Sequence, residues 1–75
     1  MQTKQIKLGC PDEVNDFVAV ASKCNFDIDI FYNRVIIDAK SFLGIMSMDL
    51  SRTLQVAYKG FNQEFESIIK KYAVI

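Results

Sequence analysis

Polar and apolar residues alternate over several short stretches of this chain, and between these stretches apolar residues recur every three or four positions. The alternation from Thr3 to Leu8 has a period of two, which predicts a strand with one buried face. Gly9 ends this stretch, and Pro11 suits the first position of a helix, where a missing N–H is not needed. The apolar spacing then predicts an amphipathic helix over roughly Pro11 to Lys23.

The middle of the chain predicts a β-hairpin. Alternation over residues 26–32 and again over 35–38 indicates two strands. Asn33-Arg34 between them has the length of a tight hairpin connection, and asparagine tolerates a positive φ angle. A two-residue turn at this point fixes the register and sets Asp29 opposite Asp38.

The remaining elements are a short helix, a strand and a last helix. Ser41 is a good N-cap for the short helix, whose own Gly44 weakens it. Thr53 to Lys59 alternates like a strand, and Asn62 precedes a helix with one apolar side. The order β-α-β-β-α-β-α predicts an α+β fold with a four-stranded antiparallel sheet and three helices on one face. The residues expected in its core are Phe17, Ile28, Ile30, Val56 and Phe65.

The short helix carries more large apolar residues than two turns can bury. Five of the seven residues from Phe42 to Met48 are large and apolar, whereas a short helix has one inward stripe. The inward stripe is expected to hold Ser41, Ile45 and Met48. The residues expected to stay partly exposed, and to bind a protein partner or a second copy of the chain, are Phe42, Leu43 and Met46.

Composition indicates a small globular protein without an affinity for nucleic acid. The 75 residues are expected to form a single domain, residues 1–75, and 51% of them are hydrophobic. Nine basic residues balance nine acidic ones, so no basic face for phosphates is expected. No signal peptide and no stretch of membrane-spanning length is recognisable, which favours a cytoplasmic location and no membrane insertion. Cys10 and Cys24 flank the first predicted helix, too far apart for a disulfide, so both are expected to be free thiols.

The segment Lys40-Ser41-Phe42-Leu43-Gly44-Ile45-Met46-Ser47-Met48 resembles the second-helix signature of HPr, the phosphocarrier of the bacterial sugar phosphotransferase system. The resemblance extends back through Ala21-Ser22-Lys23 and the turn at Asn33, and forward through the strand Leu54 to Lys59. It is weak over the first sixteen residues. The HPr-like open-faced β-sandwich that it implies is the fold that the pattern of elements predicts.

The resemblance also implies a phosphorylated histidine at the start of the first helix, followed by an arginine and a proline. Counted back without gaps, these three positions fall on Cys10, Asp12 and Glu13, and the chain contains no histidine. Acidic side chains there repel a phosphoryl group. We therefore expect a divergent HPr-like protein that is not an enzyme, carries no phosphoryl group on histidine and needs no cofactor.

Two further roles stay open at the sequence level. A helix N-terminus favours the thiolate of Cys10, although Asp12 and Glu13 oppose it, and no partner histidine is available for thiol chemistry. Ser41 occupies the position that many Gram-positive HPr proteins use for regulatory phosphorylation, but it also suits a plain N-cap. The resemblance implies a protein partner, such as a component or regulator of carbohydrate uptake, that docks on Phe42, Leu43 and Met46.

The facing carboxylates of Asp29 and Asp38 are the last candidate feature. Like charges placed opposite each other in a sheet are destabilising, so a cation or a basic neighbour such as Lys59 is expected to compensate. Two or three aspartates on a flat face lack the enclosing loop of a calcium site, and no metal site is predicted.

Overall fold

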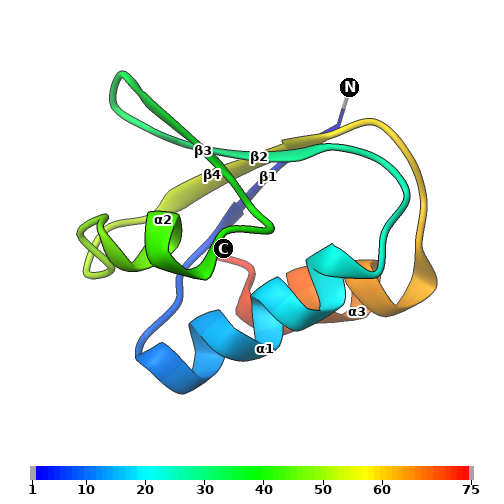
Figure 1. The fold of residues 1–75 in the computed structure, drawn as a ribbon, viewed down its shortest axis with the longest axis horizontal. Coiled ribbons are helices and arrows are strands. Elements are labelled where there is room, and N and C mark those ends of the chain that lie inside the picture. Colours follow the sequence, from blue (N-terminus) through cyan, green and yellow to red (C-terminus); the bar gives the residue numbers. More distant parts are fainter. Residues whose placement is uncertain (1, 75) are drawn as a thin grey trace.

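The computed structural model describes residues 2–74 and contains the seven elements in the predicted order. Figure 1 shows them as a sheet with helices beneath it. Their bounds are β1 (Gln2–Ile6), α1 (Pro11–Ser22), β2 (Ile28–Tyr32), β3 (Val35–Asp38), α2 (Phe42–Met46), β4 (Leu54–Tyr58) and α3 (Gln63–Tyr72). The ends of three strands differ from the prediction, and β4 is one residue shorter at each end than the predicted Thr53 to Lys59. β1 ends at Ile6 rather than at Leu8, and β2 begins at Ile28 rather than at Phe26.

The four strands form one antiparallel sheet in the order β1-β4-β2-β3. The hairpin register is the predicted one, with Tyr32 opposite Val35 and Asp29 opposite Asp38. Asn33 takes the positive φ angle of 54° that the tight turn requires. The predicted α+β architecture is therefore confirmed.

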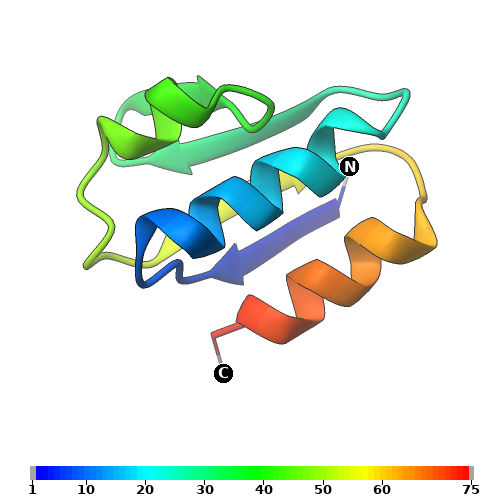
Figure 2. The same ribbon diagram turned by 60° about the horizontal axis from the view of Figure 1, so that its bottom comes forward.

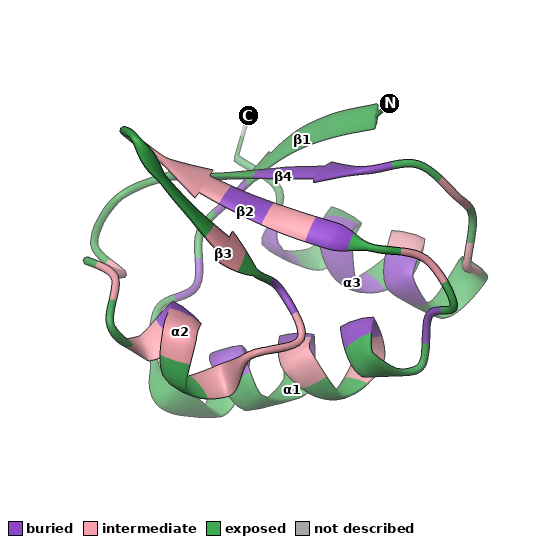
Figure 3. Cartoon of the chain, turned by 45° about the horizontal axis from the view of Figure 1, so that its top comes forward, coloured by how far each residue is buried: buried purple, intermediate pink, exposed green. Residues whose placement is uncertain are grey.

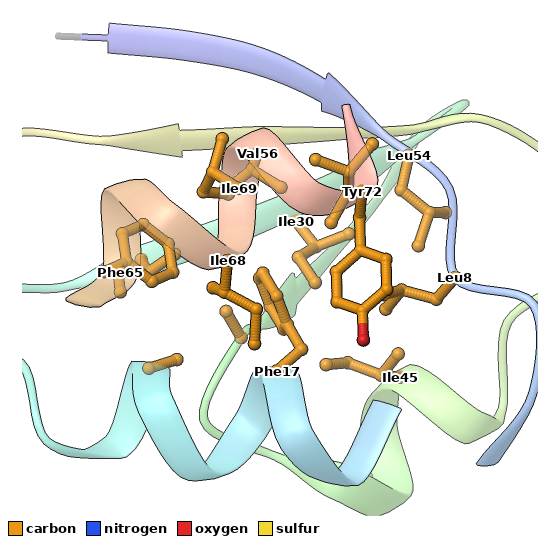
Figure 4. Packing of buried hydrophobic residues seen from close by; sticks show 14 of the residues in the cluster. Leu8, Phe17, Ile30, Ile45, Leu54, Val56, Phe65, Ile68, Ile69 and Tyr72 are labelled. Carbon is orange, nitrogen blue, oxygen red and sulfur yellow. The ribbon is translucent and has the colours of Figure 1, made fainter. Parts of the chain in front are cut away.

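All three helices cover the same face of the sheet and leave the other face open (Figures 1 and 2). The inward residues of β4 are Leu54, Val56 and Tyr58, all at most 1% exposed. In Figure 4, Phe17, Ile45 and Phe65, one from each helix, gather beneath the sheet residues Ile30 and Val56. Each of the five predicted core residues is buried.

Both ends of α3 are stabilised, the first by a capping side chain and both by charged residues. The Asn62 side chain accepts a hydrogen bond from the Phe65 N–H at 2.9 Å, which satisfies one free donor of the helix N-terminus. Glu64 and Glu66 lie in the first turn, and Lys70 and Lys71 lie in the last turn, so the charges complement the helix dipole.

An aromatic cluster fills the space between α1, α3 and β4. The Phe65 ring packs edge-on against Tyr58 with centroids 5.0 Å apart, and against Phe17 at 5.8 Å. The Tyr58 hydroxyl donates a hydrogen bond to Glu66 Oε2 at 2.7 Å. Burial, reinforced by this bond to a carboxylate, raises the pKa of Tyr58 well above its ordinary value.

None of the helices among residues 2–74 has the length and apolar content of a bilayer-spanning segment.

Candidate functional site

The beginning of α1 places Cys10 at the N-cap, with its backbone extended at φ −160° and ψ 165°. The Cys10 carbonyl accepts the N–H groups of Glu13 and Val14, but its thiol makes no capping hydrogen bond. Glu13 instead reaches back, and its Oε1 atom accepts the Gly9 N–H at 2.6 Å. This end of α1 is thus capped by a carboxylate, which leaves the Cys10 thiol exposed and free.

The second cysteine belongs to the core. Cys24 is 5% exposed, and its thiol donates a long hydrogen bond to the Val20 carbonyl at 3.7 Å. Burial raises the pKa of the Cys24 thiol, against a smaller opposite effect of the Lys40 ammonium. Both cysteines are free, as expected.

A tight turn leads from β3 into α2 and positions Ser41. The Lys40 N–H donates to Asp38 Oδ1 at 2.9 Å, and the Ser41 N–H donates to the Asp38 carbonyl at 3.0 Å. The Ser41 hydroxyl then accepts the Gly44 N–H at 3.1 Å, so Ser41 is the N-cap residue, as predicted. It is half-buried in this position.

Lys40 is committed to the end of α1. Its ammonium group donates to the carbonyl of Cys24 at 3.0 Å. A cation near the last carbonyls of a helix is stabilising, because it complements the negative end of the helix dipole. The bond also connects the start of α2 to the end of α1. Lys40 and Cys24 are 16 residues apart, so local sequence patterns do not predict this contact.

The five-residue helix α2 divides its apolar residues between the core and the surface. Ile45 is fully buried, whereas Leu43 is 80% exposed. Phe42 and Met46 are half-buried and pack against the edge of the core. We call Phe42, Leu43 and Met46 the α2 patch. Of the three residues expected to face inward, only Ile45 is fully buried, and Ser41 and Met48 are half-buried.

The α2 patch lies beside α1. The two helices pack side by side, and the beginning of α1 lies at the same end of the molecule as the end of α2 (Figures 1 and 2). Figure 3 shows exposed and half-buried segments along both helices on their outer side. A partner that covered the α2 patch would therefore approach α1 as well.

Gly44 fixes how closely α2 approaches the sheet. A Cβ atom at Gly44 would lie 2.8 Å from Ile37 Cγ2 and 2.9 Å from Ser41 Oγ. The sequence pattern marks this glycine only as a weak helix former and does not indicate its packing role. Because α2 lies so close to β3, the Ile45 side chain reaches the core while Leu43 points to solvent.

The described residues form an open depression but no cluster of metal-ligating side chains. Among residues 2–74, no three His, Cys, Asp or Glu side chains are grouped so that they could hold a metal ion. A separate open depression of about 520 Å³ lies between the hairpin turn and the start of β4, with Phe31, Asn33 and Arg52 in its lining. The Arg52 guanidinium is 3.7 Å from Asp49, and the other lining residues carry amide, hydroxyl or phenyl groups.

No protein-family model matches this chain, and no curated protein matches it. The solved structures that resemble it in fold include two HPr proteins and Crh. HPr-C-His from Thermoanaerobacter tengcongensis superposes with a TM-score of 0.76 and 25% identity over 95% of this chain and 89% of that one. The phosphocarrier protein HPr from Bacillus anthracis str. Ames superposes with a TM-score of 0.70 and 22% identity over 95% of each chain. Crh, the catabolite repression containing protein of Bacillus subtilis, superposes with a TM-score of 0.65 and 15% identity over 95% of this chain and 88% of that one.

The chain has an HPr-like fold. At 15% to 25% identity, the likeness to these structures concerns architecture rather than a shared set of site residues. In this HPr-like protein, Cys10 is the N-cap residue of α1. Its neighbours Asp12 and Glu13 lie in the first turn of α1.

Proposed function

We propose that this HPr-like protein is a binding module that recognises another protein through the α2 patch. The observation that carries the proposal is the 80% exposure of Leu43 beside half-buried Phe42 and Met46. An exposed leucine flanked by an aromatic ring and a flexible thioether forms an adaptable apolar surface. Contiguous apolar patches on a protein surface mark sites of interaction with other molecules.

Phosphoryl transfer on histidine is not part of this proposal. The sequence has no imidazole, and the first turn of α1 carries Asp12 and Glu13. The Glu13 carboxylate occupies the space next to the helix start, where it accepts the Gly9 N–H. Incubation with phosphoenolpyruvate and the first enzyme of the phosphotransferase system should therefore leave the protein unlabelled. Acid-labile phosphate on any residue would contradict this expectation.

The partner that best fits the family context is a cytoplasmic bacterial protein, a component or regulator of carbohydrate uptake. Two of the similar structures are HPr proteins, one of them a phosphocarrier protein. The third, Crh, forms a swapped dimer, so a second copy of this chain is an alternative occupant of the patch.

Ser41 is the position at which such binding would be regulated. Its hydroxyl lies next to Phe42 at the start of α2, where phosphate oxygens would accept backbone N–H groups. A phosphate there would also add negative charge to the edge of the patch. Mass spectrometry of the protein from its native cells, before and after phosphatase treatment, tests this regulation.

The main test compares two exposed apolar residues. Leu43→Ser removes the centre of the patch, and Phe61→Ser is the matched control, because Phe61 is 74% exposed outside α2. Neither change should lower the melting temperature appreciably. Proteins captured from the native cell extract should be lost with Leu43→Ser and kept with Phe61→Ser, and each captured protein should then bind the purified wild type in a titration. Equal capture by all three forms would refute the role of the α2 patch.

A further inference from the structure

The two edges of the sheet are protected very differently. Beside β1, the Val74 N–H donates to the Gln5 carbonyl at 3.0 Å, and Ala73 bridges to Ile6. The rest of β1 is polar, and its residues from Gln2 to Gln5 are exposed. At the other edge, β3 is the outermost strand, and most of it is exposed in Figure 3. Unpaired strand edges template further pairing unless they are blocked.

The backbone of β3 presents free hydrogen-bonding groups outward. Ala39 donates to the Ile28 carbonyl at 2.9 Å, so in the antiparallel alternation Ile37 and Val35 also bond to β2. The N–H and C=O groups of Ile36 and Asp38 then point away from β2. Of these, the Asp38 carbonyl accepts the Ser41 N–H.

The side chains along this edge are apolar at the centre and charged at the ends. Ile36 is 62% exposed and Val35 is 47% exposed. Ile36 and Asp38 lie at alternate positions of β3, so they share the sheet face that the helices leave open, and the exposed Arg34 lies in the hairpin turn directly before β3. An edge with exposed isoleucine at its centre lacks the inward charges and prolines that normally prevent pairing.

The facing carboxylates at this edge form no ion pair among the described residues, although Asp38 Oδ1 accepts the Lys40 N–H. Asp38 faces Asp29 across β2 and β3, and both carboxylates lie on the open face. The two ion pairs found among residues 2–74 are Lys23–Glu64 and Arg52–Asp49, and neither involves these aspartates. Facing like charges are destabilising, so a cation beside Asp38 would be favourable.

We infer that β3 pairs with β3 of a second copy of this chain, antiparallel about a two-fold axis at Ile36. This register sets Ile36 opposite its own copy and Val35 opposite Ile37 of the second copy. It also sets Arg34 opposite Asp38 of the second copy, twice by symmetry. The Arg34 guanidinium of each copy thereby lies beside the facing Asp29 and Asp38 carboxylates of the other copy. The two four-stranded sheets become one continuous sheet of eight strands.

Main-chain bonds in this register use only the free groups. Ile36 exchanges N–H···O=C bonds with its own copy, and each Asp38 N–H donates to the Arg34 carbonyl of the other chain. A strand of four residues buries less than the roughly 1,200 Å² of a standard interface, so a weak dimer with a dissociation constant of about 0.1–1 mM is expected.

The test uses charge reversal at the two ends of the strand. Arg34→Glu places Glu against Asp38, and Asp38→Lys places Lys against Arg34, so each variant alone should be monomeric in sedimentation equilibrium. An equimolar mixture restores both opposite-charge pairs and should dimerise at least as well as the wild type. Lys7→Glu, an exposed charge reversal outside β3, is the control and should leave association unchanged. Melting temperatures of all variants verify that they are folded.

Hydrogen exchange provides a second, residue-specific measurement. Protection of the Ile36 and Asp38 amides should rise with protein concentration, whereas the Ile37 amide, already bonded to β2, should not change. A wild type that stays monomeric over this concentration range, or a mixture no more dimeric than the separate variants, would overturn the inference. Leu43→Ser should leave the dimer intact, and its loss in that variant would move self-association to the α2 patch instead.

Discussion

Gly44 of α2 lies so close to Ile37 of β3 that a methyl group on the glycine would come within 2.8 Å of the Ile37 Cγ2 atom. Both atoms belong to rigid elements, and the Ser41 hydroxyl that caps α2 closes the other side at 2.9 Å. The α2 patch therefore depends on a residue that contributes no side chain to it.

Gly44→Ala should destabilise the protein, although alanine is the better helix former by about 1 kcal/mol. The added methyl group must displace Ile37 or the Ser41 cap, and overpacking of this kind costs about 1–3 kcal/mol. Urea unfolding measures the change. Ser67→Ala, at an exposed position of α3, is the control and should change stability by no more than about 0.5 kcal/mol. A stabilised Gly44→Ala protein would show that α2 can lift from β3 without loss.

Phe17→Ala should lower the free energy of unfolding by about 3–5 kcal/mol. The Phe17 ring is fully buried and packs against Phe65, so its removal leaves a cavity at the centre of the core. In a domain whose total stability is about 5–15 kcal/mol, this loss should be visible as a lower urea midpoint. Phe61→Ala, which truncates a ring that is 74% exposed, should leave the midpoint almost unchanged. A similar midpoint for both variants would contradict the packing shown in Figure 4.

The Tyr58–Glu66 contact predicts a loss of stability in alkali. Since the folded-state pKa of Tyr58 is raised, the unfolded chain releases the phenolic proton first as the pH increases. The stabilisation is complete below the unfolded pKa of about 10 and declines as the pH rises above it. Tyr58→Phe should remove this part of the decline, which urea midpoints between about pH 8 and 11 will show. Parallel pH profiles for the two proteins would refute the linkage.

The two cysteines should differ sharply in alkylation. Cys10 is exposed and should react with iodoacetamide in the native protein, whereas Cys24 is 5% exposed and has a raised pKa. Mass spectrometry should find one modified residue under native conditions and two in urea. Cys10→Ser should be unmodified when native. The rate at Cys10 also tests the thiol alternative, because a rate far above that of the same residue in urea would indicate an activated thiolate.

Periodicity in the sequence predicted the elements well because strands and helices are decided by neighbours within a few residues. The Asn33-Arg34 turn also fixed the hairpin register, since two residues allow few pairings. Element ends were less accurate. Phe26 alternates like a strand residue, yet it lies before β2 and stacks on Tyr58 with ring centroids 6.1 Å apart.

The candidate site was predicted only in part. Crowding in a short helix indicated exposed apolar residues, and exposure is indeed highest at Leu43. The contacts that hold α2 in place were missed, because Gly44–Ile37 and Lys40–Cys24 join segments whose proximity follows from the sheet order. Periodicity does not report which strand lies under which helix. The facing Asp29 and Asp38 were predicted, but Lys59 forms no ion pair with either of them.

The sheet order also constrains when the protein can fold during its synthesis on the ribosome. β1 is made first, yet its strand neighbour is β4, with Gln2 opposite Tyr58, and its outer edge is bridged by Ala73. The β2–β3 hairpin and α1 can form from local contacts, whereas β1 can pair only after β4, which ends at Tyr58, has been made. Pairing between such distant segments slows folding. The nascent chain therefore exposes an unpaired first strand until β4 has emerged from the ribosome.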